Sequence, residues 1–511
     1  MQYKNGMPIA IIGAGISGIT TANILKKNGF QAVVFEKSEK IGGVWALAYP
    51  NVHLQNIKEQ YHLSDFPWPF TPDLHPTGEQ ILNYLEQAVN HLNLDVRLNH
   101  EVIELKETED GWLLKYKNQD GVHEELFGYV VISVGQYTQG KYQPEFPGIE
   151  DFGGKIITER DVHTLDIFDN QRVVILGFGK SALDMATFAA KQGEQVNHVF
   201  RTPRWLVPEW ILGVHFTHAL FSRFGTVMMT SWAHPTAIER FLHNRLGFIV
   251  SGFWDLIASI FRFQVQRNVS GKGQEAQRRI QAVQPDHKLL PDLRSATAVA
   301  PENYYPFIAE GKISPHRAEL SGFSRESVKL KNGCEIPCDL VILSLGSQTP
   351  IFPFLPDQYR KMLETEPDGV QLYRHLLHPR IPGIAFAGFN HGYMHVPAVE
   401  IATQWLCAYL RGELELPSSE NMEKSIECIR QWKRANIQFE PSRSCAINTR
   451  FQQYIDIMLK DMGVSPYRKL PNIFAEIFGR YQASDYLGVS EEYNHKKKSR
   501  STPLHPLPLD T

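Results

Sequence analysis

The stretch that decides the fold lies at residues 9–18 and reads IAIIGAGISG. A short apolar run leads into glycines spaced Gly-x-Gly-x-x-Gly, and apolar residues at helical spacing follow. In this strand–turn–helix context, Gly13, Gly15 and Gly18 allow a tight turn. They also let backbone N–H groups approach a pyrophosphate at the N-terminus of the helix. The stretch therefore predicts a dinucleotide-binding site.

A second stretch of the same design begins its turn 164 residues later, at Gly177. Residues 173–182 read VVILGFGKSA, so Gly177 and Gly179 occupy the turn while Lys180 and Ser181 open the next helical segment. One such turn is a weak signal on its own. Two of them, each after an apolar run, predict that one chain binds two dinucleotides.

The residue at the end of the strand after each turn distinguishes the two sites. Glu36 follows Gly13 by 23 residues, and Arg201 follows Gly177 by 24 residues. A carboxylate accepts hydrogen bonds from ribose hydroxyls, whereas a guanidinium suits a 2′-phosphate. The first site is thus predicted to bind FAD or NAD and the second NADPH, with Lys180 and Arg204 as further cations. The alternative for Arg201 is a solvated charge after a strand.

A glycine pair follows Glu36 closely, in the segment Gly42-Gly43-Val44-Trp45. Glycines at this position let the chain pass close to a bulky, flat ligand. We therefore expect Gly43 and Trp45 to line the first site. The alternative for Trp45 is a role in the core alone, since buried tryptophan is common.

The composition is that of an ordinary globular protein of two or three domains. The chain has 511 residues, of which 43% are hydrophobic and 21% charged, and its net charge is −3. This charge gives no reason to expect a nucleic-acid partner. The five cysteines are scattered and lack metal-ligand spacing, so we expect no metal site and reduced thiols in a cytoplasmic protein.

Two further segments repeat one plan. Residues 129–135 read YVVISVG and residues 339–346 read DLVILSLG, and each follows a turn-rich antiparallel segment. The sequence therefore predicts an α/β protein with two dinucleotide-binding Rossmann-like domains, the second inserted into the first. The predicted parts are an FAD domain at 1–160 and 331–450, an NADP domain at 161–330, and a C-terminal helical extension at 451–511 that ends in a disordered tail from Glu491.

The predicted NADP domain contains a mostly helical, apolar insertion at about 205–283, rich in Phe, Trp, Met and His. Within it, residues 246–261 contain a single charge, Asp255, and this run is too short to span a bilayer. It can lie on a membrane surface, line an apolar substrate tunnel or form a buried helical pair. No strong basic face accompanies the apolar one, which disfavours the membrane surface.

Taken together, these motifs resemble the class B flavin-dependent monooxygenases, and the flavin-containing monooxygenase branch more closely than the Baeyer–Villiger branch. The resemblance extends to about residue 415. The segments that carry it are 13–18, 42–45, Asn56, 64–67, 146–148, 177–184, 201–205, 385–390 and 400–405. One motif departs from the family: its linker histidine is absent, and Thr158 and Glu159 follow residues 152–157 instead.

The resemblance implies a division of labour between the two cofactors. NADPH would reduce the FAD, and the reduced flavin would react with O₂. The resulting C4a-(hydro)peroxyflavin would transfer one oxygen atom to nitrogen or sulfur of a fairly apolar small molecule. It also implies that the amide of Asn56 is catalytic, by hydrogen bonding to the peroxyflavin or to retained NADP. The alternative is a loop Asn that holds a turn.

Two other functions remain open from the sequence. The first is Baeyer–Villiger oxidation of a ketone, which needs an arginine near the peroxide that the sequence does not identify. The second is a non-oxygenating flavoprotein reductase or NADPH oxidase. A thiol-based reductase would need a cysteine pair near residues 40–60, and the first cysteine is Cys334. Asp65 is expected to cap a turn, and His391 to be structural.

Overall fold

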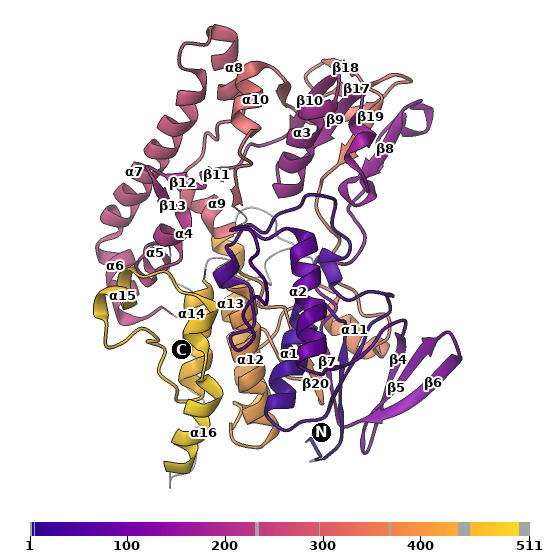
Figure 1. Cartoon of the computed structure of the whole chain (residues 1–511), viewed down its shortest axis with the longest axis vertical. Helices are drawn as coiled ribbons and strands as arrows, with labels where there is room; N and C mark the ends of the chain where they lie inside the picture. The colour runs from indigo at the N-terminus through magenta and orange to yellow at the C-terminus, as the bar shows by residue number, and fades with distance from the viewer. Residues whose placement is uncertain are drawn as a thin grey trace.

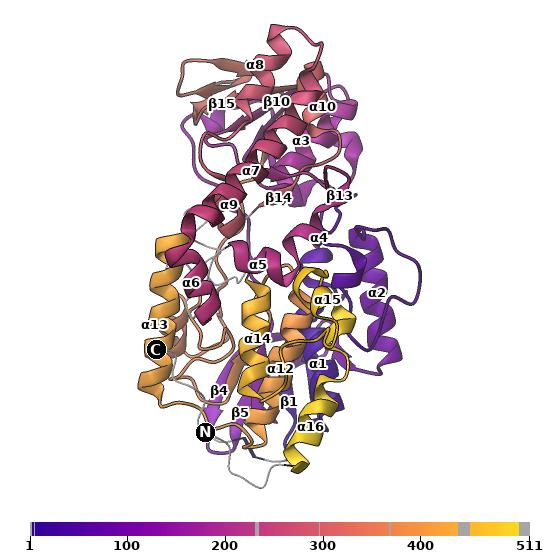
Figure 2. The same cartoon turned by 90° about the vertical axis from the view of Figure 1, so that its left-hand side faces the viewer.

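The computed structural model describes residues 3–4, 6–229, 235–295, 297–366, 369–437 and 450–499. Two parallel sheets form two lobes, the first in the lower part of Figure 1 and the second at its upper right (Figure 1). The long helix α7 (Gly247–Gln266) runs along the left side of the same view. The helices nearest the C-terminus cover the first lobe, as Figure 2 also shows.

The first sheet has five parallel strands in the order β20-β7-β1-β2-β3. Its central strands are fully apolar and buried, as expected for a parallel sheet covered on both faces. The strands are β1 (Ile9–Ile12), β2 (Ala32–Phe35), β3 (Asp95–Arg97), β7 (Tyr129–Ile132) and β20 (Ile384–Phe386). The accompanying helices are α1 (Ile16–Lys27), α2 (Gly78–His91), α11 (Asp357–Leu363) and α12 (His395–Leu410). Helix α2 starts at a Thr77–Gln80 capping box.

The second sheet also has five parallel strands, in the order β15-β10-β9-β19-β8. The strands are β8 (Lys155–Thr158), β9 (Arg172–Leu176), β10 (Gln195–Phe200), β15 (Ile313–Arg317) and β19 (Leu340–Leu343). Helices α3 (Lys180–Gln192), α8 (Gln274–Ala282) and α10 (Tyr304–Glu310) pack beside it.

The two sheets share one plan, which confirms the predicted fold class. In each, the strand before the glycine turn is central, and a three-stranded antiparallel sheet precedes one of its neighbours along the chain. These antiparallel sheets are β4 (Glu101–Thr108), β5 (Gly111–Asn118) and β6 (Gly121–Phe127), and β16 (Leu320–Phe323), β17 (Ser327–Leu330) and β18 (Glu335–Pro337). The second unit enters between β7 and β20, so the first sheet receives its last strand only after the second is complete.

The strand pairing corrects two predicted boundaries. Residues 155–158 were assigned to the first domain, and 340–343 to its returning part, but both segments form strands of the second sheet. β19 pairs with β9 on one side and with β8 on the other. Both β8 and β19 therefore form backbone hydrogen bonds within the second sheet. Boundaries at 160 and 330 therefore cut through the second sheet.

The insertion between β10 and β15 is mostly helical, as predicted. Its strands are β11 (Leu206–Val207), β12 (Trp210–Ile211), β13 (Val214–His215) and β14 (Ala298–Val299). Its helices are α4 (Phe216–Leu220), α5 (Arg223–Met229), α6 (Ala237–Arg245), α7, α8 and α9 (Leu289–Ser295). Among the described residues of the insertion, the hairpin and the β11–β14 pairing depart from the helical expectation.

Helix α7 is two-sided. Val250, Trp254 and Phe261 are buried, whereas Phe248 and Phe263 on the same helix are 74% and 60% exposed. The helical segment Gly247–Val269 is longer than the apolar run at 246–261. By length and composition alone it could cross a membrane, and 28% of an apolar 18-residue stretch within it is buried. A purely buried helical pair is thus excluded, because α7 also presents a large apolar face to the outside.

The C-terminal part is helical, with one correction to the predicted tail. Its helices are α13 (Ser419–Asn436), α14 (Phe451–Asp461), α15 (Ile473–Phe478) and α16 (Val489–Ser499). Helix α16 covers the start of the segment predicted to be disordered, because Val489 and Tyr493 are buried and Tyr493 donates a hydrogen bond to Glu413 Oε2 at 2.9 Å. The rest of the predicted tail, residues 500–511, lies outside the described residues.

Candidate functional site

The first glycine turn is built so tightly that only glycine fits at two of its positions. Gly13 has a φ of +110°, and a Cβ there would overlap the carbonyl oxygen of Ser133. A Cβ at Gly18 would overlap the carbonyl oxygen of Gly13. Helix α1 starts directly after Gly15, which has no side chain to cap the first N–H groups. These groups can therefore bind an anionic ligand.

The predicted glycine pair lies directly on this turn. Gly42 N donates to Ala14 O at 2.9 Å. A Cβ built on Gly43 would lie 3.1 Å from Gly15 Cα, which leaves little room for any larger residue. Trp45 follows and is half-buried, with Nε1 donating to Tyr61 Oη at 2.9 Å. The two segments thus form one compact surface.

Glu36 lies at the carboxyl end of β2, beside the same turn. Its Oε2 accepts a hydrogen bond from Ala14 N at 2.8 Å, and its Oε1 accepts one from Ser38 N at 3.0 Å. Each carboxylate oxygen has a second acceptor position. The side chain is therefore fixed by the backbone while it keeps capacity for ribose hydroxyls.

A late segment of the chain completes the first site, and the sequence did not identify its contacts. His395, at the start of α12, has Nε2 at 2.9 Å from Ser17 Oγ. A Cβ at Gly388 would lie 2.5 Å from the same hydroxyl oxygen. Burial lowers the pKa of His395 to about 4, so its imidazole is neutral at neutral pH. Because 378 residues separate Ser17 from His395, no local pattern could reveal the pair.

Several buried polar atoms next to this turn lack a hydrogen-bond partner among the described residues. They are Ser133 Oγ, both amide atoms of Gln136, and His395 Nδ1. Ser133 and Gln136 follow β7, so all three residues belong to segments that flank the first turn. Buried polar atoms without partners are unfavourable and rare in folded proteins. A polar, partly flat group such as a flavin dinucleotide would supply the missing partners, so these residues fit FAD.

The predicted catalytic residue, Asn56, is buried beside the late segment. Its Nδ2 donates to the carbonyl oxygen of Tyr393, and its own carbonyl oxygen lies 2.8 Å from His75 Nδ1. Tyr393 Oη in turn donates to Thr297 O at 3.0 Å. Asn56 therefore connects the loop before α2 with the segment before α12.

Two neighbouring candidates have structural contacts. Asp65, expected to cap a turn, forms an ion pair with Lys27 and accepts a hydrogen bond from Asn23 Nδ2 at 3.3 Å. His391 stacks edge-on against Tyr137, with ring centroids 5.3 Å apart.

The second glycine turn is more open than the first. Gly177 has a φ of +120°, and a Cβ there would overlap the carbonyl oxygen of Ser344. At Gly179, by contrast, a Cβ would meet no described atom within 4 Å beyond its two chain neighbours. Ser181 is half-buried in the first turn of α3. The room at Gly179 is where the backbone would approach a pyrophosphate.

The cations predicted at the second site differ in their partners. Lys180 forms an ion pair with Asp184, which also accepts a hydrogen bond from Tyr49 Oη at 2.7 Å. Arg204 Nη1 lies 3.4 Å from Oδ1 of the buried Asp292. Arg201 is exposed just beyond the carboxyl end of β10. Its position matches that of Glu36 after β2, as the sequence predicted.

The position of the absent linker histidine is occupied by a polar cluster. Thr158 Oγ1 donates to Asp161 Oδ2 at 2.8 Å. Glu159 is buried and forms an ion pair with Lys141. The segment after β7 is therefore tied to the end of β8 by a buried acid–base pair.

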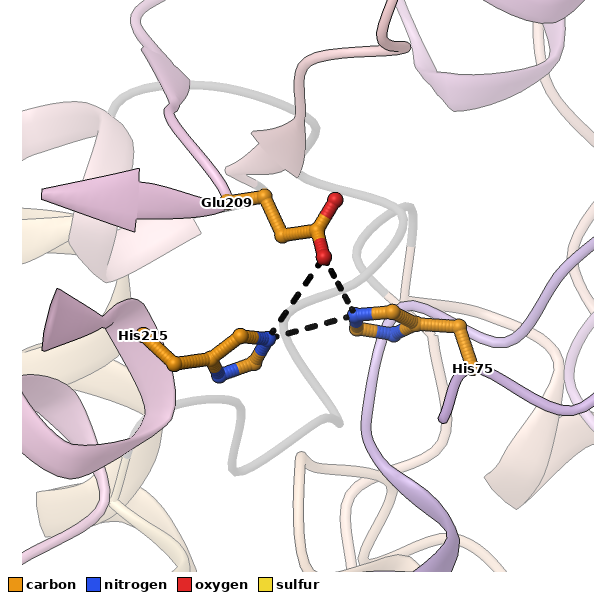
Figure 3. Close-up of side chains that lie close together, drawn as sticks. All are labelled: His75, Glu209 and His215. Atoms are coloured by element: carbon orange, nitrogen blue, oxygen red, sulfur yellow. Dashed lines mark hydrogen bonds and ion pairs between the residues drawn. The ribbon is translucent and has the colours of Figure 1, made fainter. Parts of the chain in front are cut away.

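Local sequence patterns did not identify one cluster of potential metal ligands. His75, Glu209 and His215 place one potential metal-ligating atom each within 4.8 Å of one another (Figure 3). The sequence indicated no metal site because these three ligands have no regular spacing along the chain. The loop before α2 and the hairpin β12–β13 come together only in the folded chain.

Comparisons with known proteins agree with this geometry. The model of the flavin-binding monooxygenase-like family matches residues 6–247 and 293–477. A probable flavin-containing monooxygenase 1 from Arabidopsis thaliana is 29% identical over 531 aligned positions, covering 95% of this chain and 97% of that protein. The family match covers both glycine turns.

Solved structures of related folds are also similar. S-allyl-L-cysteine S-oxygenase from Allium sativum gives a TM-score of 0.63 at 19% identity, covering 97% of this chain and 99% of that one. An open structure of cyclohexanone monooxygenase gives 0.65 at 18% identity, covering 89% and 97%. The chain therefore belongs to the flavin-binding monooxygenase-like family and is a flavin-dependent monooxygenase that uses FAD and NADPH.

Proposed function

We propose that this enzyme uses NADPH and O₂ to add one oxygen atom to nitrogen or sulfur of a fairly apolar small molecule. The observation that carries the proposal is the pair of glycine turns, one closed beside partnerless polar atoms and one open beside Arg201. Such a pair suits a retained flavin and an exchangeable reduced nucleotide.

The first turn is proposed to hold FAD. Its backbone N–H groups at the start of α1 bind the pyrophosphate, and Glu36 accepts hydrogen bonds from ribose hydroxyls. The residues assigned to this role are Gly13, Gly15, Gly18, Glu36, Gly43 and Trp45. FAD held there would supply the redox and oxygen chemistry of the reaction.

The second turn is proposed to hold NADPH. The start of α3 binds its pyrophosphate, and Arg201 binds the 2′-phosphate, because it is exposed at the matching strand end. The residues assigned to this role are Gly177, Gly179, Lys180, Ser181, Arg201 and Arg204. Lys180 and Arg204 would act while remaining paired with Asp184 and Asp292.

Asn56 is proposed to be the catalytic side chain. Its amide is buried between the loop before α2 and the segment before α12, where water is largely excluded. A buried amide N–H there can donate a hydrogen bond to the reacting part of the cofactors. Its bond to Tyr393 O orients the amide in the absence of ligand.

The likeness over 97% of the chain to a protein named as an S-oxygenase supports oxidation of a heteroatom. The second candidate is Baeyer–Villiger oxidation of a ketone, supported by the likeness to cyclohexanone monooxygenase. A cytoplasmic enzyme is proposed, and Cys338 and Cys407 are free, buried thiols, in keeping with a reducing compartment. The exposed apolar face of α7 keeps contact with a membrane surface open.

Two measurements test the proposal. The first reduces the protein with NADPH without oxygen, then admits air and follows the absorbance. A transient near-ultraviolet band marks the oxygenated flavin, whereas direct return of oxidised flavin would indicate an oxidase or reductase. The second determines product masses for amines, sulfides and ketones. Oxygen gain only with ketones would replace the proposed activity with the Baeyer–Villiger reaction.

A further inference from the structure

We infer that His75, Glu209 and His215 form a binding site for a divalent transition metal, of which Zn²⁺ is the best match. The three side chains point at one another from two separate segments (Figure 3). None of them belongs to the two nucleotide sites. This metal site would therefore be separate from the cofactor sites of the proposed flavin enzyme.

The distances between the ligand atoms fit a tetrahedral ion. His75 Nε2 and His215 Nε2 are 3.4 Å apart. Zn–N bonds of about 2.0–2.1 Å in tetrahedral geometry place two nitrogens about 3.3–3.4 Å apart. Glu209 Oε1 is slightly farther, at 3.8 Å from His75 Nε2 and 3.9 Å from His215 Nε2. Its side chain is 39% exposed, so it has room to move inward by the roughly half ångström that Zn–O bonding requires.

The ring of His75 is held with its ligand nitrogen facing the cluster. Its Nδ1 lies 3.1 Å from Leu54 O and 2.8 Å from Asn56 O. Both atoms are carbonyl oxygens, which only accept, so Nδ1 carries the hydrogen. Nε2 then has a free lone pair directed toward Glu209 and His215. Metal-ligating histidines commonly show this arrangement, with the second ring nitrogen bound to a carbonyl.

His215 is oriented by a hydroxyl group. Its Nδ1 lies 2.8 Å from Thr217 Oγ1, and Thr217 is completely buried. Arg480 Nη1 lies 3.3 Å from the same oxygen, so the hydroxyl is held from both sides. Thr217 N also donates to His215 Nδ1 at 3.4 Å, so Nδ1 accepts in the structure and Nε2 carries the hydrogen. A metal at Nε2 would displace this hydrogen to Nδ1, where Thr217 Oγ1 can accept it, because a hydroxyl can donate or accept.

The hairpin β12–β13 fixes the spacing of the other two ligands. Trp210 pairs with His215, and the turn residues Leu212 and Gly213 have φ values of +49° and +88°. Positive values at both turn positions are typical of the tight type I′ hairpin. Phe216 N also donates to Glu209 O at 3.0 Å. Glu209 and His215 are thus presented by one rigid element.

The composition of the cluster selects the kind of ion. Two imidazoles and one carboxylate suit Zn²⁺ and neighbouring transition metals, whereas Mg²⁺ and Ca²⁺ prefer oxygen ligands. Three protein ligands leave a fourth position for water. Because His75 also contacts the backbone of Asn56, the ion would clamp the insertion hairpin to the loop that carries the proposed catalytic residue.

The test measures Zn²⁺ binding to the full-length, FAD-bound protein after treatment with a chelator and desalting. We expect one Zn²⁺ per chain by competition with a chromophoric chelator. We expect His75→Gln and His215→Gln to weaken binding about 100-fold or more, and Glu209→Gln about 10-fold, as loss of one of three ligands predicts. The matched control is His218→Gln, three residues beyond His215, which should bind like the unaltered chain.

Two outcomes would overturn the inference. If the unaltered protein takes up no Zn²⁺, the two histidines share only a hydrogen bond. If the Gln variants bind as tightly as the unaltered chain, the ion sits elsewhere. Should the histidine variants fail to fold, Co²⁺ bound to the unaltered protein must still show the strong visible absorption of a tetrahedral site. That absorption must weaken in Glu209→Gln, a variant chosen because the Glu209 side chain is 39% exposed. An unchanged spectrum rejects the site.

Discussion

The two glycine turns share a sequence design but differ in how the rest of the chain surrounds them. The first is covered by residues 42–45 and by the segment from Gly388 to His395. The second has open space at Gly179 and an exposed Arg201 beyond its second strand. A closed cradle made from three distant segments suits a cofactor that stays bound. An open turn with an exposed cation suits one that must bind and leave in every cycle.

The largest effect is expected when a side chain is added inside the first glycine turn. Gly18→Ala places a Cβ onto the carbonyl oxygen of Gly13, so we expect purified protein without yellow colour and without detectable FAD. Gly179→Ala is the matched control, because a Cβ there meets no described atom within 4 Å beyond its two chain neighbours. It should keep its FAD, measured by absorbance and by release on heating, and show only a higher KM for NADPH. An equal loss of FAD in both variants would contradict the comparison.

The free energy of unfolding should depend on pH because His395 is buried against the first turn. Its pKa is about 4 in the folded protein, against an ordinary value of 6.5, because it is buried. Protons therefore bind the unfolded chain first, and the free energy of unfolding falls as the pH drops from about 6.5 toward 4. Across this pH range, the free energy of unfolding should fall by at most about 3 kcal/mol because of His395.

Urea unfolding at pH 7 and pH 5 checks this expectation. The fall in the free energy of unfolding between these values should be smaller in His395→Gln by about 2 kcal/mol, the part of the expected fall that lies above pH 5. His163→Gln, at an exposed position, should keep the full pH dependence. An identical fall in all three proteins would show that His395 titrates normally.

A moderate effect is expected at the open turn. Arg201→Ala should lower kcat/KM for NADPH roughly 10–100-fold, as expected for a lost hydrogen bond to a charged group. The value for NADH should stay unchanged, because NADH lacks the 2′-phosphate. Steady-state oxidation of both nucleotides gives the ratio. If both values fall equally, Arg201 does not recognise the phosphate.

The smallest catalytic effect should follow from Arg204, which is held by buried Asp292. Asp292 also accepts hydrogen bonds from Trp205 N at 2.7 Å and contacts His287 Nε2 at 2.8 Å. In Arg204→Met the carboxylate keeps these partners, so we expect a loss of about 1–2 kcal/mol of stability. KM for NADPH should rise less than in Arg201→Ala. Thermal unfolding and nucleotide titration of both variants distinguish a structural from a binding role.

Local patterns were sufficient for the features that depend on neighbouring residues. The glycine turns, the contrast between Glu36 and Arg201, and the duplicated strand pattern were all readable, because strand, turn and helix lie within about 30 residues of one another. The boundaries at 160 and 330 were wrong for the opposite reason. β8 and β19 join the second sheet by pairing with each other and with β9, and pairing partners far apart in sequence leave no local signal.

The sequence by itself determined that this chain folds as two dinucleotide-binding units, because glycine spacing is local chemistry. The charge at the end of each second strand is also local, and from it we predict that the two units prefer different riboses. Only the tertiary structure decided what surrounds those units. The contact of Ser17 with His395 and the cluster of His75 with Glu209 and His215 join segments more than 100 residues apart. Such contacts exist because the chain leaves the first unit after β7, forms the second unit and then returns to complete the first sheet.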